Sequence, residues 1–177
     1  MSAGPRLGDD IERGKTLEFS QSVTYPGTVD EVVAMFLSSG YQERRFGSFV
    51  VEGSSSTVVE GERITFSGTV RPELIPPPAA SRFVKGDLRV TFVEEWSREE
   101  AVARSRSTVT VEGAPVSFRA VSVLSPSGQG AERDVTGDVS VRIPLLGGRI
   151  EKEAVARAGR VIERERELAA SWLEEHR

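Results

Sequence analysis

The 177-residue sequence contains no cysteine and a single histidine, His176. Without cysteine the chain can form no disulfide, no thiolate metal site and no cysteine nucleophile. One histidine beside the last residue is a poor basis for a Ser-His-Asp triad or a histidine-rich zinc site. The Gly-x-Ser-x-Gly and Gly-x-x-x-x-Gly-Lys-Ser/Thr motifs are also missing. We therefore expect no metal and no cofactor, and no motif supports a catalytic role.

An excess of positive charge is missing as well. Lys and Arg number 23 against 27 Asp and Glu, which gives a net charge of -4 and a pI near 5.3. Such a chain has no electrostatic reason to approach nucleic acid or an anionic membrane. No apolar run approaches the roughly 18 residues of a membrane span, and residues 1–10 lack the apolar core of a secretion signal. We expect a cytoplasmic protein with no nucleic-acid partner and no membrane span.

Hydrophobic content of 38% and charged content of 28% are ordinary for a globular protein of this length. Residues 1–13 carry glycine, proline and charge without periodicity, and we predict a mobile tail there. The remainder, residues 14–177, is predicted to form a single domain. The sequence indicates nothing larger than a monomer or a weak homodimer.

The C-terminal part of the chain is predicted to be one long helix, residues 149–175. It contains no proline, and Gly147-Gly148 permits a sharp entry into it. At 1.5 Å per residue the helix would be about 40 Å long, enough to cross a small domain. Apolar residues recur at helical spacing and predict one buried face: Ile150, Ala154, Val155, Ala158, Val161, Ile162, Leu168, Ala169, Trp172 and Leu173.

Near the N-terminus, residues 17–25 alternate between apolar and polar and predict a half-buried strand. Thr28 and Glu31 then form a capping-box pattern that predicts a short helix to about residue 37. Residues 41–45 are expected to add one further turn. Arg44 and Arg45 are interpreted as solvated surface charges, the usual state of arginine.

From Gly47 onward the sequence predicts mainly strands, with residues 49–52, 57–60 and 64–70 first. Prolines at 72 and 76–78 then predict a crossing loop over residues 71–86, with a helical turn at 79–84. Four further strands are predicted at 87–97, 102–112, 116–124 and 133–143. Because their connections are short, neighbouring strands are expected to be antiparallel.

A strand, two short helices, six antiparallel strands and one long helix form an order that resembles the START-like (SRPBCC, helix-grip) superfamily. The finer resemblance is to an uncharacterised actinobacterial family, domain of unknown function 2505. Residues 141–151 (VRIPLLGGRIE), 113–116 (GAPV) and 87–90 (DLRV) carry it. The resemblance implies an α+β fold in which a curved antiparallel sheet of six or seven strands wraps around the C-terminal helix, with a ligand cavity between them.

Two positions bear on whether that cavity is open. The first is the strand at residues 102–112, whose side chains alternate between the interior and the solvent. In one phase of this alternation Ser105 and Ser107 face the interior. In the other phase Arg104 and Arg106 do, as an anchor for an anionic ligand. The serine phase is favoured because it buries no charge, and small serines would leave space unfilled. Glu165 lies in the middle of the apolar helix stripe, so it either borders a cavity or pairs with an arginine at the rim.

The hypothesis from sequence is binding of a small hydrophobic molecule, lipid-like or polyketide-like, in the cavity between sheet and helix. An alternative is a cyclase or aromatase-type enzyme that uses Glu94 or Glu165, with a raised pKa, as acid or base. Another is a structural or partner-binding domain with a filled pocket. The candidate cavity residues are those expected to face inward: Phe66, Phe92, Glu94, Trp96, Ser105, Ser107, Phe118, Val161, Glu165 and Leu168.

Overall fold

A computed structural model describes residues 16–71, 86–142 and 147–177. A strand and two short helices come first, then six strands, then one long helix. The elements are β1 (Leu17–Tyr25), α1 (Val29–Phe36), α2 (Ser39–Phe46), the 3-10 turn η1 (Gly47–Phe49), β2 (Ser56–Glu60), β3 (Arg63–Thr69), β4 (Arg89–Glu99), β5 (Val102–Glu112), β6 (Val116–Ser127), β7 (Gly130–Val141) and α4 (Gly147–Glu175).

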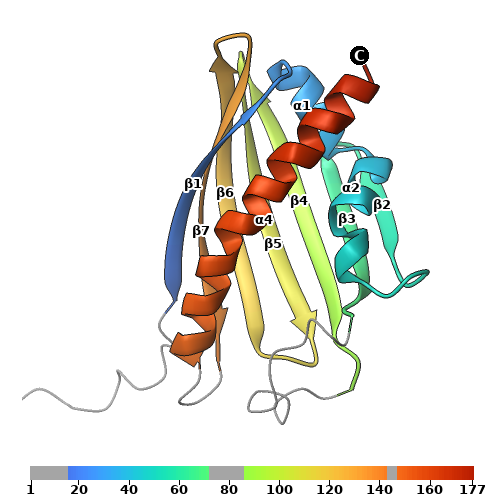
Figure 1. The fold of residues 1–177 in the computed structure, drawn as a ribbon, viewed down its shortest axis with the longest axis vertical. Coiled ribbons are helices and arrows are strands. Elements are labelled where there is room, and N and C mark those ends of the chain that lie inside the picture. The colour runs from blue at the N-terminus through green and yellow to red at the C-terminus, as the bar shows by residue number, and fades with distance from the viewer. Residues whose placement is uncertain (1–15, 72–85, 143–146) are drawn as a thin grey trace, which may run out of the picture.

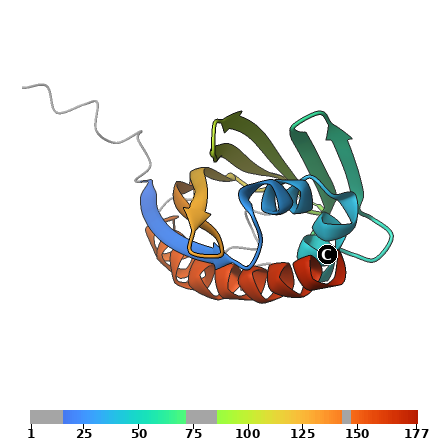
Figure 2. The same cartoon turned by 90° about the horizontal axis from the view of Figure 1, so that it is seen from above.

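The strands form one antiparallel seven-stranded sheet in the order β1-β7-β6-β5-β4-β3-β2. The sheet curves around one face, and α4 crosses that face diagonally (Figures 1 and 2). The first half of α4 lies beside β1 and β7, and its C-terminal end lies near α1 and α2 (Figure 1). The predicted helix-grip architecture is therefore confirmed.

Local signals explain most element boundaries. Thr28 Oγ1 accepts from the Glu31 amide at 3.2 Å, and the Thr28 amide donates to Glu31 Oε2 at 2.7 Å, so the predicted capping box is confirmed. The connection between the strands predicted at 116–124 and 133–143 is shorter than expected, because Pro126 pairs with Ala131 and the hairpin turns at Gly128, where φ is 55°.

Two other expectations are wrong in detail. Residues 49–52 do not form a strand: η1 covers part of them, and Val50 makes only a single bridge to Val70. The turn expected at 41–45 is longer, since α2 covers Ser39–Phe46. The predicted tail at 1–13 and the predicted turn at 79–84 lie outside the described residues.

The largest buried cluster lies where α1, α2 and the C-terminal end of α4 meet the sheet. Phe36, Tyr41 and Leu124 have no exposed surface there, and Leu173 of α4 packs against them. Phe36 stacks on Trp96 with ring centroids 5.4 Å apart. Burial of these large side chains, worth about 1.5–3 kcal/mol each, fixes α4 to this end of the sheet.

Candidate functional site

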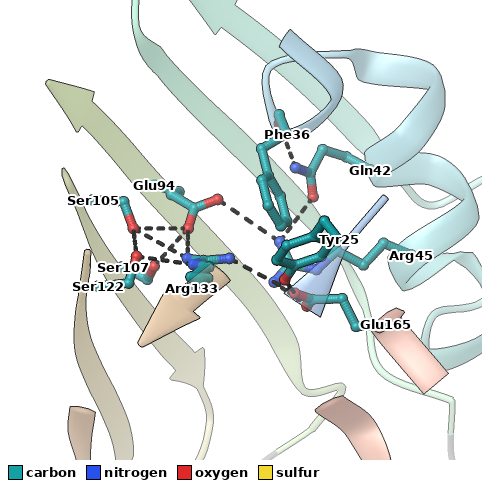
Figure 3. A network of polar contacts seen from close by, with 10 residues as sticks. All are labelled: Tyr25, Phe36, Gln42, Arg45, Glu94, Ser105, Ser107, Ser122, Arg133 and Glu165. Atoms are coloured by element: carbon teal, nitrogen blue, oxygen red, sulfur yellow. Dashed lines mark hydrogen bonds and ion pairs between the residues drawn. The ribbon is translucent and has the colours of Figure 1, made fainter. Parts of the chain in front are cut away.

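Four charged side chains from four elements meet between the sheet and α4 (Figure 3). They are Arg45 of α2, Glu94 of β4, Arg133 of β7 and Glu165 of α4. Arg133 Nη2 lies 2.5 Å from Glu94 Oε1, and Arg45 Nη2 lies 2.5 Å from Glu165 Oε2. Two longer contacts close a ring, Arg133 Nη1 to Glu165 Oε1 at 3.6 Å and Arg45 Nη1 to Glu94 Oε2 at 3.8 Å. We call this balanced group the charge quartet.

The charge quartet is almost wholly removed from water. Glu94 has no exposed surface and the Arg133 side chain is 4% exposed, whereas those of Arg45 and Glu165 retain 13% and 10%. An unpaired charge in such a place is strongly destabilising, so each member depends on its opposite partners. The Arg45–Glu165 side is the more accessible one.

Three serines of β5 and β6 add hydrogen bonds on the sheet side (Figure 3). Ser107 Oγ donates to Glu94 Oε1 at 3.0 Å, and Arg133 Nε donates to Ser122 Oγ at 2.8 Å. Arg133 Nη2 also donates to Ser105 Oγ at 3.1 Å. The predicted inward phase of Ser105 and Ser107 is thus confirmed, but the space expected above Ser105 holds the Arg133 guanidinium.

The protonation states follow from this geometry. Burial alone would raise the pKa of Glu94, but the Arg133 and Arg45 guanidiniums and the Ser107 hydrogen bond together hold that pKa below its ordinary value. Glu94 is therefore ionised, and the hypothesis that it has a raised pKa is wrong. The pKa of Tyr25 is raised, chiefly by burial and next by the Glu165 carboxylate. Tyr25 stays protonated and donates to Glu165 Oε1 at 3.1 Å.

Aromatic rings enclose both guanidinium groups. The Arg133 guanidinium lies 4.6 Å from the Phe36 centroid and 5.1 Å from that of Trp96. Arg45 lies 4.8 Å from the Phe46 centroid and 5.0 Å from that of Phe92. Cation–π attraction is strongest for desolvated groups such as these.

Arg45 is not the solvated surface charge that the sequence suggested. Its own helix, α2, presents buried Tyr41 and Gln42 to the interior, and Arg45 lies on the same side, one turn after Tyr41. Gln42 Nε2 donates to the Phe36 carbonyl at 2.6 Å and fixes α2 against α1. The arginine is thereby aimed at the centre of the fold, where Glu165 balances its charge.

The quartet divides the inner sheet face into two unequal halves. On the side of α1, inward-facing Trp96, Ala103 and Leu124 are at most 4% exposed. On the other side, five apolar side chains that face the same way are only half-buried: Val90, Val109, Val111, Val116 and Phe118. Others there, such as Phe92 and Val139, are buried. Among the described residues, the interior is closed beyond the quartet at one end and includes more half-buried apolar side chains at the other.

Two small apolar clusters occupy the half-buried end. In one, buried Phe66 and Phe92 pack with half-buried Phe46, Val90 and Val109. In the other, half-buried residues pack around two buried valines of β7: Val116, Phe118 and Val155 with Val139 and Val141. Phe118 also stacks on Phe19 with ring centroids 5.3 Å apart.

The remaining candidate residues are distributed over both halves. Trp96 belongs to the large buried cluster of the closed half, and half-buried Leu168 packs against that cluster. Val161 is 47% exposed, so its inward assignment is wrong. The face of α4 that is turned toward the interior runs through Ile162, Ala169 and Leu173. Relative to the predicted face the helix is therefore rotated about its axis, and Val161 lies outside the buried face.

Glu165 lies between Ile162 and Ala169 on the buried face of the helix, next to Arg45. The predicted pairing of Glu165 with an arginine is confirmed, but the pair lies in the interior and not at the rim, since the Arg45 side chain is only 13% exposed. Four polar members of this site were not identified from the sequence: Tyr25, Arg45, Ser122 and Arg133. For Arg133 a signal existed, because Val135 and Val139 lie two and six residues after it on the strand predicted at 133–143, and such residues share one face of a strand.

Within the described ranges, no group of three or more His, Cys, Asp or Glu side chains is placed to hold a metal ion. The two carboxylates of the quartet face guanidinium groups instead. No helix among the described residues combines the length and the apolar character needed to cross a membrane. The quartet can therefore interact with other groups through paired charges and hydrogen bonds.

Comparison with known protein families and proteins gives matches over most of the chain. The family described as "Protein of unknown function (DUF2505)" matches residues 20–173. An uncharacterised protein of Mycobacterium tuberculosis (strain ATCC 25618 / H37Rv) is 24% identical over 166 residues, which cover 88% of this chain and 95% of that protein. An uncharacterised protein of Mycobacterium bovis matches equally, with 24% identity over 166 residues.

Among solved structures, norcoclaurine synthase from Thalictrum flavum superposes with a TM-score of 0.59 at 9% identity, covering 99% of this chain and 98% of that one. The protein Ara h 8.0201 has a TM-score of 0.56 at 11% identity, covering 91% and 99%. At these identities the likeness shows the fold alone, which is the START-like, Bet v 1-like helix-grip fold.

Proposed function

The chain belongs to the DUF2505 family and has a START-like fold, and from this premise we propose that it binds a small, mainly hydrophobic molecule, lipid-like or polyketide-like, between the sheet and α4. Proteins of this fold commonly bind hydrophobic ligands. The observation that carries the proposal is the unequal closure of the inner sheet face, described above.

The half-buried end offers an apolar surface on the concave side of a curved sheet. Val90 and Val109 extend from neighbouring strands β4 and β5, and Phe118 extends from β6. Covering such surface contributes roughly 25 cal/mol per Å² of apolar area. Small-molecule sites typically combine an apolar lining with a few polar groups that set the orientation. The charge quartet supplies those polar groups at the inner end.

Catalysis by a carboxylate receives less support. A general acid near neutral pH needs a raised pKa, and the pKa of Glu94 is lowered. The carboxylates of both glutamates are also engaged by arginine within 2.5 Å. A binding role uses these groups as they stand, with no change in protonation.

The test is a fluorescence titration with N-phenylnaphthylamine, an uncharged apolar probe that brightens when it leaves water. Val109→Phe fills the half-buried end and should weaken probe binding by about tenfold, the cost of displacing a well-placed apolar group. Thr108→Phe is the matched control, because Thr108 is the next residue of β5 and is exposed on the opposite face.

Urea denaturation of both variants checks that Val109→Phe remains folded at the titration temperature. If the wild type fails to bind the probe, or if the two phenylalanine variants bind it equally well, the proposed site is wrong. Native mass spectrometry of the protein purified from its source then identifies any molecule that co-purifies.

A further inference from the structure

Building on the binding role proposed above, we propose that the end of the ligand that reaches the charge quartet is electrically neutral and donates a hydrogen bond. The protein would then select long-chain alcohols, phenols or similar neutral molecules over carboxylates such as fatty acids. Three features of the site lead to this ligand class: its charge balance, its position relative to the apolar end, and one unpaired oxygen.

The charge balance excludes an additional anion. Arginine side chains in a pocket normally anchor carboxylates through paired hydrogen bonds. Here both guanidiniums are already held by Glu94 and Glu165, at 2.5 Å in each case. A ligand carboxylate would bring a third negative charge to two positive ones, beside a glutamate with no exposed surface. Desolvation and repulsion both oppose that arrangement.

The position of Arg45 links the apolar end to the quartet. Its guanidinium lies 5.0 Å from the Phe92 ring centroid, and Phe92 packs with Val90 and Val109. A molecule lying on these valines therefore meets the Arg45–Glu165 pair first. That pair is also the part of the quartet with measurable exposure, 13% and 10% of the two side chains.

One oxygen of the quartet has no hydrogen bond. Glu94 Oε2 is buried, and no donor among the described residues lies within hydrogen-bond distance of it. Its nearest charged partner is Arg45 Nη1, at 3.8 Å. Buried carboxylate oxygens are almost always satisfied by a donor. A hydroxyl or amide N–H beside Arg45 would satisfy it, whereas a second carboxylate would repel it.

The first experiment uses the wild-type protein and measures displacement of N-phenylnaphthylamine at about pH 8, where a fatty acid is ionised. Dodecanol should displace the probe at a concentration about tenfold lower than dodecanoate does, or lower still. Methyl dodecanoate, which is neutral but donates no hydrogen bond, should fall between them. Equal or tighter binding of dodecanoate would overturn the inference and leave the binding role intact.

The second experiment changes the charge balance. Glu165→Gln leaves one positive charge in excess at Arg45, so affinity for dodecanoate should rise about tenfold while that for dodecanol changes by less than about threefold. Glu163→Gln is the matched control, because Glu163 lies on the exposed side of the same helix and pairs with Arg166. It should shift neither affinity.

The outcomes separate the two proposals. If neither dodecanol nor N-phenylnaphthylamine binds the wild type, the binding role itself is wrong and the inference falls with it. If both bind but Glu165→Gln gains nothing for dodecanoate, the quartet does not set the selectivity. A melting curve of Glu165→Gln confirms folding, and the wild-type comparison decides the ligand class even if that variant does not fold.

Discussion

Replacement of Arg133 by methionine is the most direct test of the charge quartet. The change removes the guanidinium that contacts Glu94 at 2.5 Å and donates to Ser122 at 2.8 Å. Methionine retains an unbranched apolar stem of similar length, so the loss is chiefly electrostatic. Glu94 remains behind with no exposed surface and one fewer partner.

The expected cost follows from that orphaned carboxylate. Removing one partner of a buried ion pair typically destabilises a protein by about 3–5 kcal/mol. Glu94 keeps the hydrogen bond from Ser107 at 3.0 Å and the Arg45 contact at 3.8 Å. We therefore expect the lower part of this range, about 3 kcal/mol, out of the roughly 5–15 kcal/mol that stabilise a typical domain.

Urea denaturation near neutral pH measures this loss as a shift of the transition midpoint at constant slope. Arg119→Met is the matched control: Arg119 pairs with Asp138 at 3.5 Å across β6 and β7, with its side chain 70% exposed. Exposed pairs of this kind contribute about 0–1 kcal/mol. If Arg133→Met costs no more than Arg119→Met, the view of the quartet as a desolvated, mutually dependent group is refuted.

Two further measurements follow from the same reasoning. Without Arg133 the pKa of Glu94 rises in the folded variant, so the stability difference from the wild type should shrink as the pH falls. Adding Glu94→Gln removes the orphaned charge and leaves Arg45 balanced by Glu165. The loss of unfolding free energy in the double variant should therefore be smaller than the sum of the losses in the two single variants, by about 1 kcal/mol or more.

Three other predictions concern single side chains. Because the folded-state pKa of Glu94 lies below its ordinary value of 4.5, its contribution is present above that pH and lost below it; wild-type stability in urea should fall through this window, and less so in Glu94→Gln. Tyr25→Phe removes the donor to Glu165 and should cost about 1.5–3 kcal/mol by the same assay. Val161→Ala should cost less than about 0.5 kcal/mol in thermal melts, against about 2–5 kcal/mol for Leu173→Ala, since only Leu173 is buried.

The order of elements and the inward phase of β5 could be predicted from sequence because short-range physics decides both. Alternation has a period of two residues, so a single choice of phase assigns every side chain of a strand to one face. On β5 the choice lay between burying Ser105 and Ser107 and burying Arg104 and Arg106. The serine phase avoids the desolvation of two charges, and it is the phase that the structure has.

The partners of Glu94 and Glu165 could not be predicted in the same way. Glu94 and Arg133 are 39 residues apart, and they meet only because the Arg133 side chain reaches from β7 across β6 and β5 to β4. Arg45 reaches Glu165 only once α2 is docked and α4 is rotated. Because arginine usually lies at the protein surface, the sequence alone predicts a solvated side chain, and only the packing of the helices shows a buried one.

The rotation of α4 illustrates the same limit. Val161 and Ile162 are adjacent on the helix, and the apolar pattern alone admits either as the more buried residue. The docking of Leu173 beside α1 decides the outcome, since it turns Ile162 and Ala169 toward the sheet. Glu165 then lies in the interior beside Arg45.

The location of the quartet bears on its purpose. Buried ion pairs are weak evidence for stability, because well-packed apolar side chains of similar volume often stabilise a fold as well or better. A chain that required only a filled core would gain little from two arginines and two glutamates at its centre. These residues lie between an end of the interior that is fully buried and an end that includes several half-buried apolar side chains. In the binding role proposed above, a polar group at that place orients the ligand. The proposed selectivity accounts for this position more directly than stability does.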